Sequence, residues 1–60
     1  MELVIVKVIR NKKIVNQENF KSYDEALDFA MRQSWRGYTS LILRNHNNKW
    51  IKSFLNPDII

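Results

Sequence analysis

The sequence predicts a small α+β domain in which one helix packs on a four-stranded antiparallel sheet, in the order ββαββ. Three observations support this prediction. The segment 3–9 is apolar on both faces of a strand, a capped amphipathic helix begins after Ser22, and two strand-like segments joined by a polar turn follow Gly37. The chain of 60 residues has the length of a single small domain.

The first expected strand covers about residues 2–10, and the second covers residues 14–17, with Phe20 as its furthest end. The polar stretch between them contains Asn11, a residue type that adopts the left-handed backbone conformation of tight turns. The weak apolar pattern of the second strand is typical of a sheet edge. We therefore expect a hairpin with the first strand in the centre of the sheet.

The helix is expected to begin after Ser22 and to end at Gly37. Ser22 and Glu25 have the spacing of a capping box, in which the Ser22 hydroxyl accepts from the Glu25 N–H and the Glu25 carboxylate accepts from the Ser22 N–H. Phe29 lies off the apolar stripe and is expected to be exposed, either alone or within a contact surface. The stripe expected to face the sheet contains Tyr23, Ala26, Leu27, Ala30, Met31 and Ser34.

After the helix, a third strand over 38–44, a turn over 45–48 and a fourth strand over 49–55 make a second hairpin. Short, uncrossed connections favour the strand order 2-1-3-4, with 2-1-4-3 as the alternative. A small apolar patch is expected at residues 59–60. The whole chain is thus one domain.

A helix of about fourteen residues is about 21 Å long and covers one face of such a sheet, which leaves the other face open. The side chains expected under the helix are Val4, Val6, Val8, Thr39, Leu41 and Leu43. Ser40 and Arg44 are expected on the open side. If the first strand has the reverse orientation, its valines line the open side instead. The residues assigned to an interface on the open side are Leu3, Ile5, Ile9, Tyr38, Ile42, Trp50 and Phe54.

Protein binding is the function that this expected surface favours. Aromatic residues with basic residues at the periphery are typical of protein interfaces, and an apolar patch of a few hundred Å² is costly to leave in water. A domain this small also gains stability by association. We therefore expect a non-enzymatic adaptor, inhibitor or regulator that forms a homodimer.

Single-stranded nucleic acid is the alternative ligand for the same face. Bases would stack on Trp50, Tyr38 or Phe54 while basic side chains contact phosphates. Against this, the net charge of +4 is modest and the first strand contributes aliphatic side chains. A further alternative packs Trp50 and Phe54 under the helix and leaves an ordinary sheet surface. The basic residues considered for nucleic-acid contacts are Lys7, Arg10, Lys12, Lys13, Arg44 and Lys52.

The sequence contains no catalytic, metal-binding or cofactor-binding motif. His46 is the single histidine and lies in the expected Asn-rich turn, and the chain has no cysteine. Helix capping, the helix dipole and an Asp28–Arg32 pair account for Asp24, Glu25 and Asp28. We therefore expect no enzyme activity, no cofactor and no small-molecule substrate. The lack of cysteine and the short apolar N-terminal segment predict a cytoplasmic protein without a signal peptide or membrane span.

Overall fold

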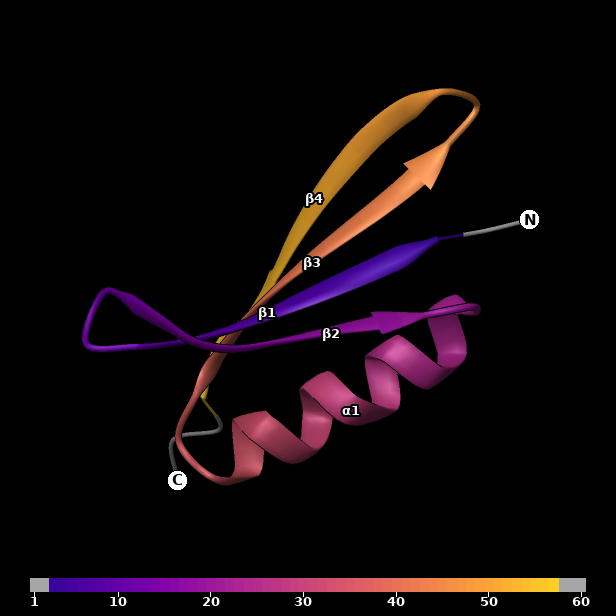
Figure 1. Ribbon diagram of the computed structural model, residues 1–60. Helices are drawn as coiled ribbons and strands as arrows, with labels where there is room; N and C mark the ends of the chain where they lie inside the picture. Colours follow the sequence, from indigo (N-terminus) through magenta and orange to yellow (C-terminus); the bar gives the residue numbers. More distant parts are fainter. Residues whose placement is uncertain (1–2, 58–60) are drawn as a thin grey trace.

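The computed structural model describes residues 3–57. Its four strands form one antiparallel sheet in the order β2-β1-β3-β4, and the helix lies across one face of that sheet (Figure 1). This confirms the predicted ββαββ fold and strand order. The expected strand start at Glu2 and the patch at 59–60 lie outside the described residues. The elements are β1 (Val4–Arg10), β2 (Lys13–Phe20), α1 (Tyr23–Trp35), β3 (Thr39–His46) and β4 (Lys49–Leu55).

Both hairpins turn through two consecutive residues with positive φ. Asn11 and Lys12 have φ of 53° and 64°, and Asn47 and Asn48 have φ of 52° and 62°. Two left-handed residues in succession form a type I′ turn, whose twist matches that of the flanking strands. The turn expected over 45–48 therefore contracts to Asn47 and Asn48, and β3 runs two residues beyond its predicted end. β2 begins one residue earlier than predicted, at Lys13.

The two edge strands, β2 and β4, pair differently with their neighbours. On β2, whose edge position is confirmed, Val8 lies opposite Asn16 and Ile9 lies opposite Ile14. Val15 is therefore an extra residue, which makes a β-bulge. β4 pairs with β3 along its whole length without a register shift.

The start of α1 shows the Ser22 half of the predicted capping box. The Glu25 N–H donates a hydrogen bond to Oγ of Ser22 at 3.2 Å. One turn further on, Arg32 forms the expected ion pair with Asp28, with 3.1 Å between Nη2 and Oδ2. Both charged side chains are 64% exposed, so this pair contributes little to stability.

The end of α1 is connected tightly to β3. Gly37 has a φ of 89°, and its N–H donates to the Ser34 carbonyl at 3.1 Å. The Tyr38 N–H donates to the Gln33 carbonyl at 3.0 Å. These hydrogen bonds end the helix directly before β3, which begins at Thr39.

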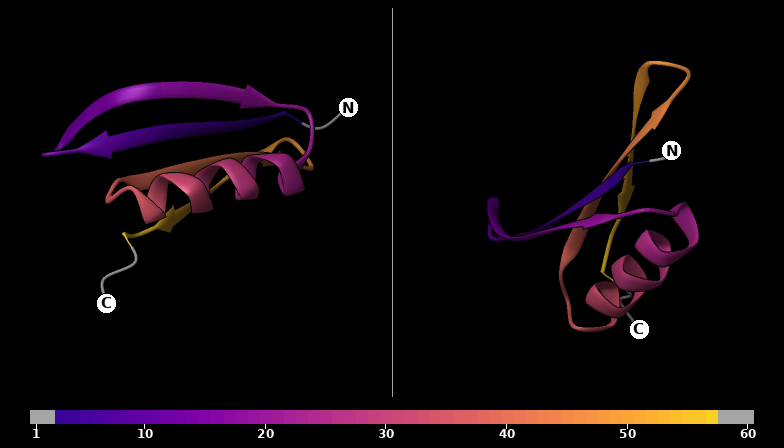
Figure 2. Two further views of the ribbon diagram at one scale, coloured as in Figure 1. Left: turned by 90° about the horizontal axis from the view of Figure 1, so that it is seen from below. Right: turned by 45° about the vertical axis from the view of Figure 1, so that its right-hand side comes forward.

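Small side chains form the core between α1 and the sheet. The alanines of α1 allow the helix to lie close to β1 and β3, and Figures 1 and 2 show the whole helix on one side of the twisted sheet. Of the predicted helix stripe, Ala26, Ala30 and Ser34 are buried. Tyr23 and Leu27 are half-buried, and Met31 is 43% exposed. The buried apolar residues are Val4, Val6, Val8, Ala26, Ala30 and Ile42.

The expectation that Phe29 is exposed was wrong. Its side chain is half-buried against the core, and its ring centroid lies 5.3 Å from that of Phe20. Phe20 ends β2 opposite Val4, on the face that carries α1, so the two rings close the space between the helix and β2. Among residues 3–57, no helix combines the length and the apolar character needed to cross a membrane.

Candidate interaction surface on the open sheet face

The face of the sheet opposite α1 carries no covering element within residues 3–57 (Figure 2). On β1, the side chains of this face alternate with the three buried valines. Cross-strand pairing extends the face to β3 and β4: Ile5 lies opposite Leu43, which lies opposite Lys52. We call this surface the open face. It contains Leu3, Ile5, Lys7, Ile9, Ile14, Gln17, Asn19, Thr39, Leu41, Leu43, Asn45, Trp50, Lys52 and Phe54.

Most of the predicted interface residues lie on this open face. Leu3 continues the β1 ladder, because its carbonyl accepts from the Asn45 N–H at 3.4 Å. Trp50 and Phe54 are 50% and 62% exposed, so the alternative that packs them under the helix is wrong. Participation in an interface stays a prediction. The predicted residues placed here are Leu3, Ile5, Ile9, Trp50 and Phe54.

The predicted orientation of β3 was wrong by one residue. Ser40 and Ile42 face α1 and are 0% and 2% exposed, whereas Thr39, Leu41 and Leu43 lie on the open face. β3 begins at Thr39, directly after the hydrogen bonds that end α1. Because strand side chains alternate, a shift by one residue moves each of them to the other face. The sequence pattern alone favours the opposite orientation, with Thr39, Leu41 and Leu43 under the helix.

Tyr38 and Arg44 also lie away from the open face. Arg44 is opposite Val4 and shares its face, and its guanidinium carbon lies 4.6 Å from the ring centroid of Tyr23. Tyr38 precedes β3, and the guanidinium carbon of Arg10 lies 5.4 Å from its ring centroid. Both contacts have cation–π geometry. These aromatic and basic residues therefore stabilise the helix side of the sheet rather than extend the open face.

The basic residues considered for nucleic-acid binding do not form one continuous surface. Only Lys7 and Lys52 of that set lie on the open face. In the part of the chain that the structure describes, the acidic residues lie on α1 or, as with Glu18 opposite Val6, on the helix side of β2. Within residues 3–57 the open face thus has an apolar centre, uncharged polar side chains toward its margins, two lysines and no carboxylate. The basic residues placed elsewhere are Arg10, Lys12, Lys13 and Arg44.

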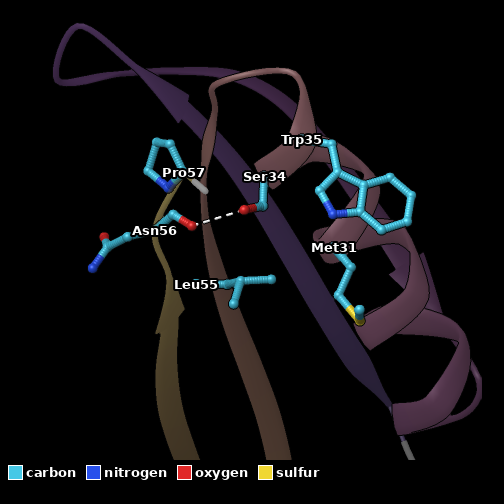
Figure 3. A pocket seen from close by; sticks show the side chains of 6 residues that line it. All are labelled: Met31, Ser34, Trp35, Leu55, Asn56 and Pro57. Carbon is cyan, nitrogen blue, oxygen red and sulfur yellow. Dashed lines mark hydrogen bonds between the residues drawn. The ribbon is translucent and has the colours of Figure 1, made fainter. Parts of the chain in front are cut away.

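A hollow of about 270 Å³ lies between the end of α1 and β4 (Figure 3). Figure 3 shows Met31 and Trp35 from α1 on one side of it and Leu55 on the other. Oγ of Ser34 donates a hydrogen bond to the Asn56 carbonyl at 2.8 Å. The hollow is smaller than the about 300 to 1,000 Å³ of typical ligand pockets, and this polar pair is already bonded.

His46 is the last residue of β3 and is exposed, so it lies beside the turn rather than within it. Among the residues between 3 and 57, no group of three or more His, Cys, Asp or Glu side chains is arranged to hold a metal ion.

No known protein family, curated protein or solved structure matches this chain.

Proposed function

We propose that this chain is a non-enzymatic binding protein, an adaptor, inhibitor or regulator, that acts through its open face. Its first partner is a second copy, whose open face stacks on its own to form a homodimer. The observation that carries the proposal is that the sheet buries small apolar side chains and exposes large ones: the core holds valine, alanine and isoleucine, while Leu3, Trp50 and Phe54 are exposed. The absence of cysteine favours a cytoplasmic location.

The energetics favour association of modest strength. A chain of 60 residues buries only about 60% of the surface that its unfolded form exposes. Fully burying one large apolar side chain contributes about 1.5 to 3 kcal/mol, so covering Trp50 and Phe54 adds substantially to a small core. Four strands of seven residues present about 440 Å² in projection. Because the side chains project from the sheet, the accessible surface that stacking buries exceeds this projected area; a standard interface buries about 800 Å² per partner. We therefore expect reversible association.

The two lysines determine how the dimer responds to salt. The aliphatic stems of Lys7 and Lys52 can lie along the apolar surface while their ammonium groups reach the rim. Stacking two open faces brings these like charges closer without a carboxylate on the described part of either face. Because salt screens this repulsion, the dimer is expected to strengthen as ionic strength rises.

Sedimentation across a concentration series tests the homodimer. We expect Ile5→Lys, which places a charge at the centre of the open face, to abolish face stacking and lower the average molar mass in sedimentation, while its helical circular dichroism is retained. Met31→Lys is the matched control, because it makes the same chemical change at an exposed apolar position of α1. A wild-type protein that stays monomeric at the highest concentration contradicts the proposal. Equal association of wild type and Ile5→Lys contradicts it as well.

Single-stranded nucleic acid is a second candidate ligand, favoured by one arrangement on β4. Trp50, Lys52 and Phe54 lie on the same face of this strand, with the cation between two exposed rings. Such a row can stack bases and contact a phosphate. Titration of a labelled single strand at two salt concentrations distinguishes the candidates. If Lys7 and Lys52 each contact a phosphate, the logarithm of the binding constant falls with the logarithm of the salt concentration at a slope of about −1.4. Salt thus weakens the nucleic-acid complex and strengthens the dimer. If no single strand binds at low salt, nucleic-acid binding is excluded.

A further inference from the structure

The two edge strands of the sheet differ in how well they resist pairing with another chain. The edge of β2 is interrupted by the bulge at Val15, and its central residues are polar. β4 is regular along its whole length, and Trp50, Ile51 and Phe54 are 50%, 48% and 62% exposed. A long, regular edge with exposed apolar side chains on both faces is a template for strand addition.

We propose that β4 pairs antiparallel with β4 of a second copy, around a twofold axis that is perpendicular to the sheet and passes through Ser53. The two four-stranded sheets then become one eight-stranded sheet with both helices on the same face. In this register, Ile51 lies opposite Leu55 of the second copy on the helix side, and Lys52 lies opposite its Phe54 on the open face. The contact uses the edge of β4 and leaves the open face uncovered, so it does not depend on face stacking.

The side chains of β4 favour this register over registers centred at Lys52 or at Ile51. Directly opposite residues of an antiparallel pair lie on the same face of the sheet. In a symmetric pair of β4 strands, the twofold axis therefore passes midway between two copies of the same residue, and each register is named by that residue. An axis at Lys52 places two lysines opposite each other, and neither β3 nor β4 has a carboxylate that could neutralise their charge. An axis at Ile51 places Phe54 and Leu55 opposite the turn of the second copy. The axis at Ser53 instead pairs apolar with apolar and cation with aromatic side chains.

The hydrogen-bonding pattern of the hairpin is consistent with an axis at Ser53. In a two-residue hairpin the pair that flanks the turn is hydrogen-bonded, so the backbone groups of every second residue from Lys49 point toward β3. Those of Trp50, Lys52 and Phe54 therefore point outward from the sheet edge. The two copies of Ser53 then make a non-hydrogen-bonded pair with a Cα separation of about 4.5 Å. This separation is within the range of about 4.4 to 6.8 Å that a disulfide spans.

Disulfide cross-linking of Ser53→Cys tests the proposal, because the chain has no cysteine of its own. Glu18→Cys is the matched control: this residue is exposed and lies on the helix side of the other edge strand. In a glutathione redox buffer at about 50 μM protein, Ser53→Cys is expected to form covalent dimer about tenfold faster than the control, since pairing raises the effective thiol concentration toward the millimolar range. Adding Lys52→Pro removes an outward N–H, and the rate is then expected to fall to that of the control.

Three outcomes would overturn the proposal. Equal rates for Ser53→Cys and Glu18→Cys show that the β4 edges do not meet at Ser53. Fast cross-linking that survives Lys52→Pro, with the fold verified by circular dichroism, shows a contact that is not a backbone ladder. Loss of cross-linking on addition of Ile5→Lys shows that the contact belongs to the open face. Conversely, if Ile5→Lys leaves sedimentation unchanged and Ser53→Cys cross-links rapidly, only the face-stacking homodimer fails.

Discussion

Ser40 provides a direct test of the orientation of β3 and of the packing beneath α1. Its side chain is 0% exposed, and Oγ has no hydrogen-bond partner among the residues that the structure describes. Leaving a buried hydroxyl unsatisfied costs about 1 to 3 kcal/mol relative to its state in water. Ser40→Ala removes the hydroxyl and keeps Cβ, so the free energy of unfolding is expected to rise.

The size of this effect follows from opposing contributions. Removing the hydroxyl abolishes the desolvation cost, while one lost heavy atom forfeits several contacts of about 0.1 to 0.2 kcal/mol each. The lower strand propensity of alanine takes away a further fraction of a kcal/mol. The expected net gain for Ser40→Ala is about 1 kcal/mol. In a domain of about 60 residues this raises Tm by about 4 to 8 °C.

Thermal and urea unfolding, followed by circular dichroism, measure the change. The protein concentration is held constant, because association would contribute to apparent stability. Ser53→Ala is the control, since Ser53 lies on the helix side of the sheet, as Ser40 does, but is exposed. Its replacement is expected to change stability by less than about 0.5 kcal/mol. If Ser40→Ala lowers the free energy of unfolding while Ser53→Ala does not, the Ser40 hydroxyl is satisfied and the reasoning is refuted.

Two other predictions concern the sheet. Ile42→Ala is expected to lower the free energy of unfolding by about 2 to 5 kcal/mol, because this side chain is 2% exposed under α1. Leu41→Ala, on the open face, should cost much less in the monomer, and urea unfolding that gives the reverse ranking would contradict the observed orientation of β3. Lys12→Gly is expected to stabilise the protein by about 0.5 to 1 kcal/mol, because Lys12 has a φ of 64° and Asn-Gly is the preferred type I′ pair. A lower Tm for Lys12→Gly would show that the turn is not strained.

Local features of the sequence were sufficient to predict most of the fold. The cap at Ser22 depends on residues within one turn, and the turn at Asn11 depends on the backbone preference of a single residue type. The seven-residue apolar segment indicated a central strand because each of its faces needed a cover. On β4, Trp50 and Phe54 were placed correctly because they alternate with residues better suited to the helix side. These predictions rest on interactions between near neighbours in the chain.

The orientation of β3 and the position of Phe29 were decided only by tertiary structure. β3 carries apolar side chains on both faces, so its own alternation does not decide which face is buried. In the folded chain, β3 follows the connection through Gly37 in the orientation that buries Ile42. Phe29 lies off the helix stripe, yet the end of β2 brings Phe20 to within 5.3 Å between ring centroids. The helix and the strands could thus be predicted from the sequence alone, because caps, turns and side-chain alternation depend on residues close together in the chain. The strand order could be predicted because the connections between the strands are short. Which side of β3 is buried depends on contacts between residues far apart in the chain.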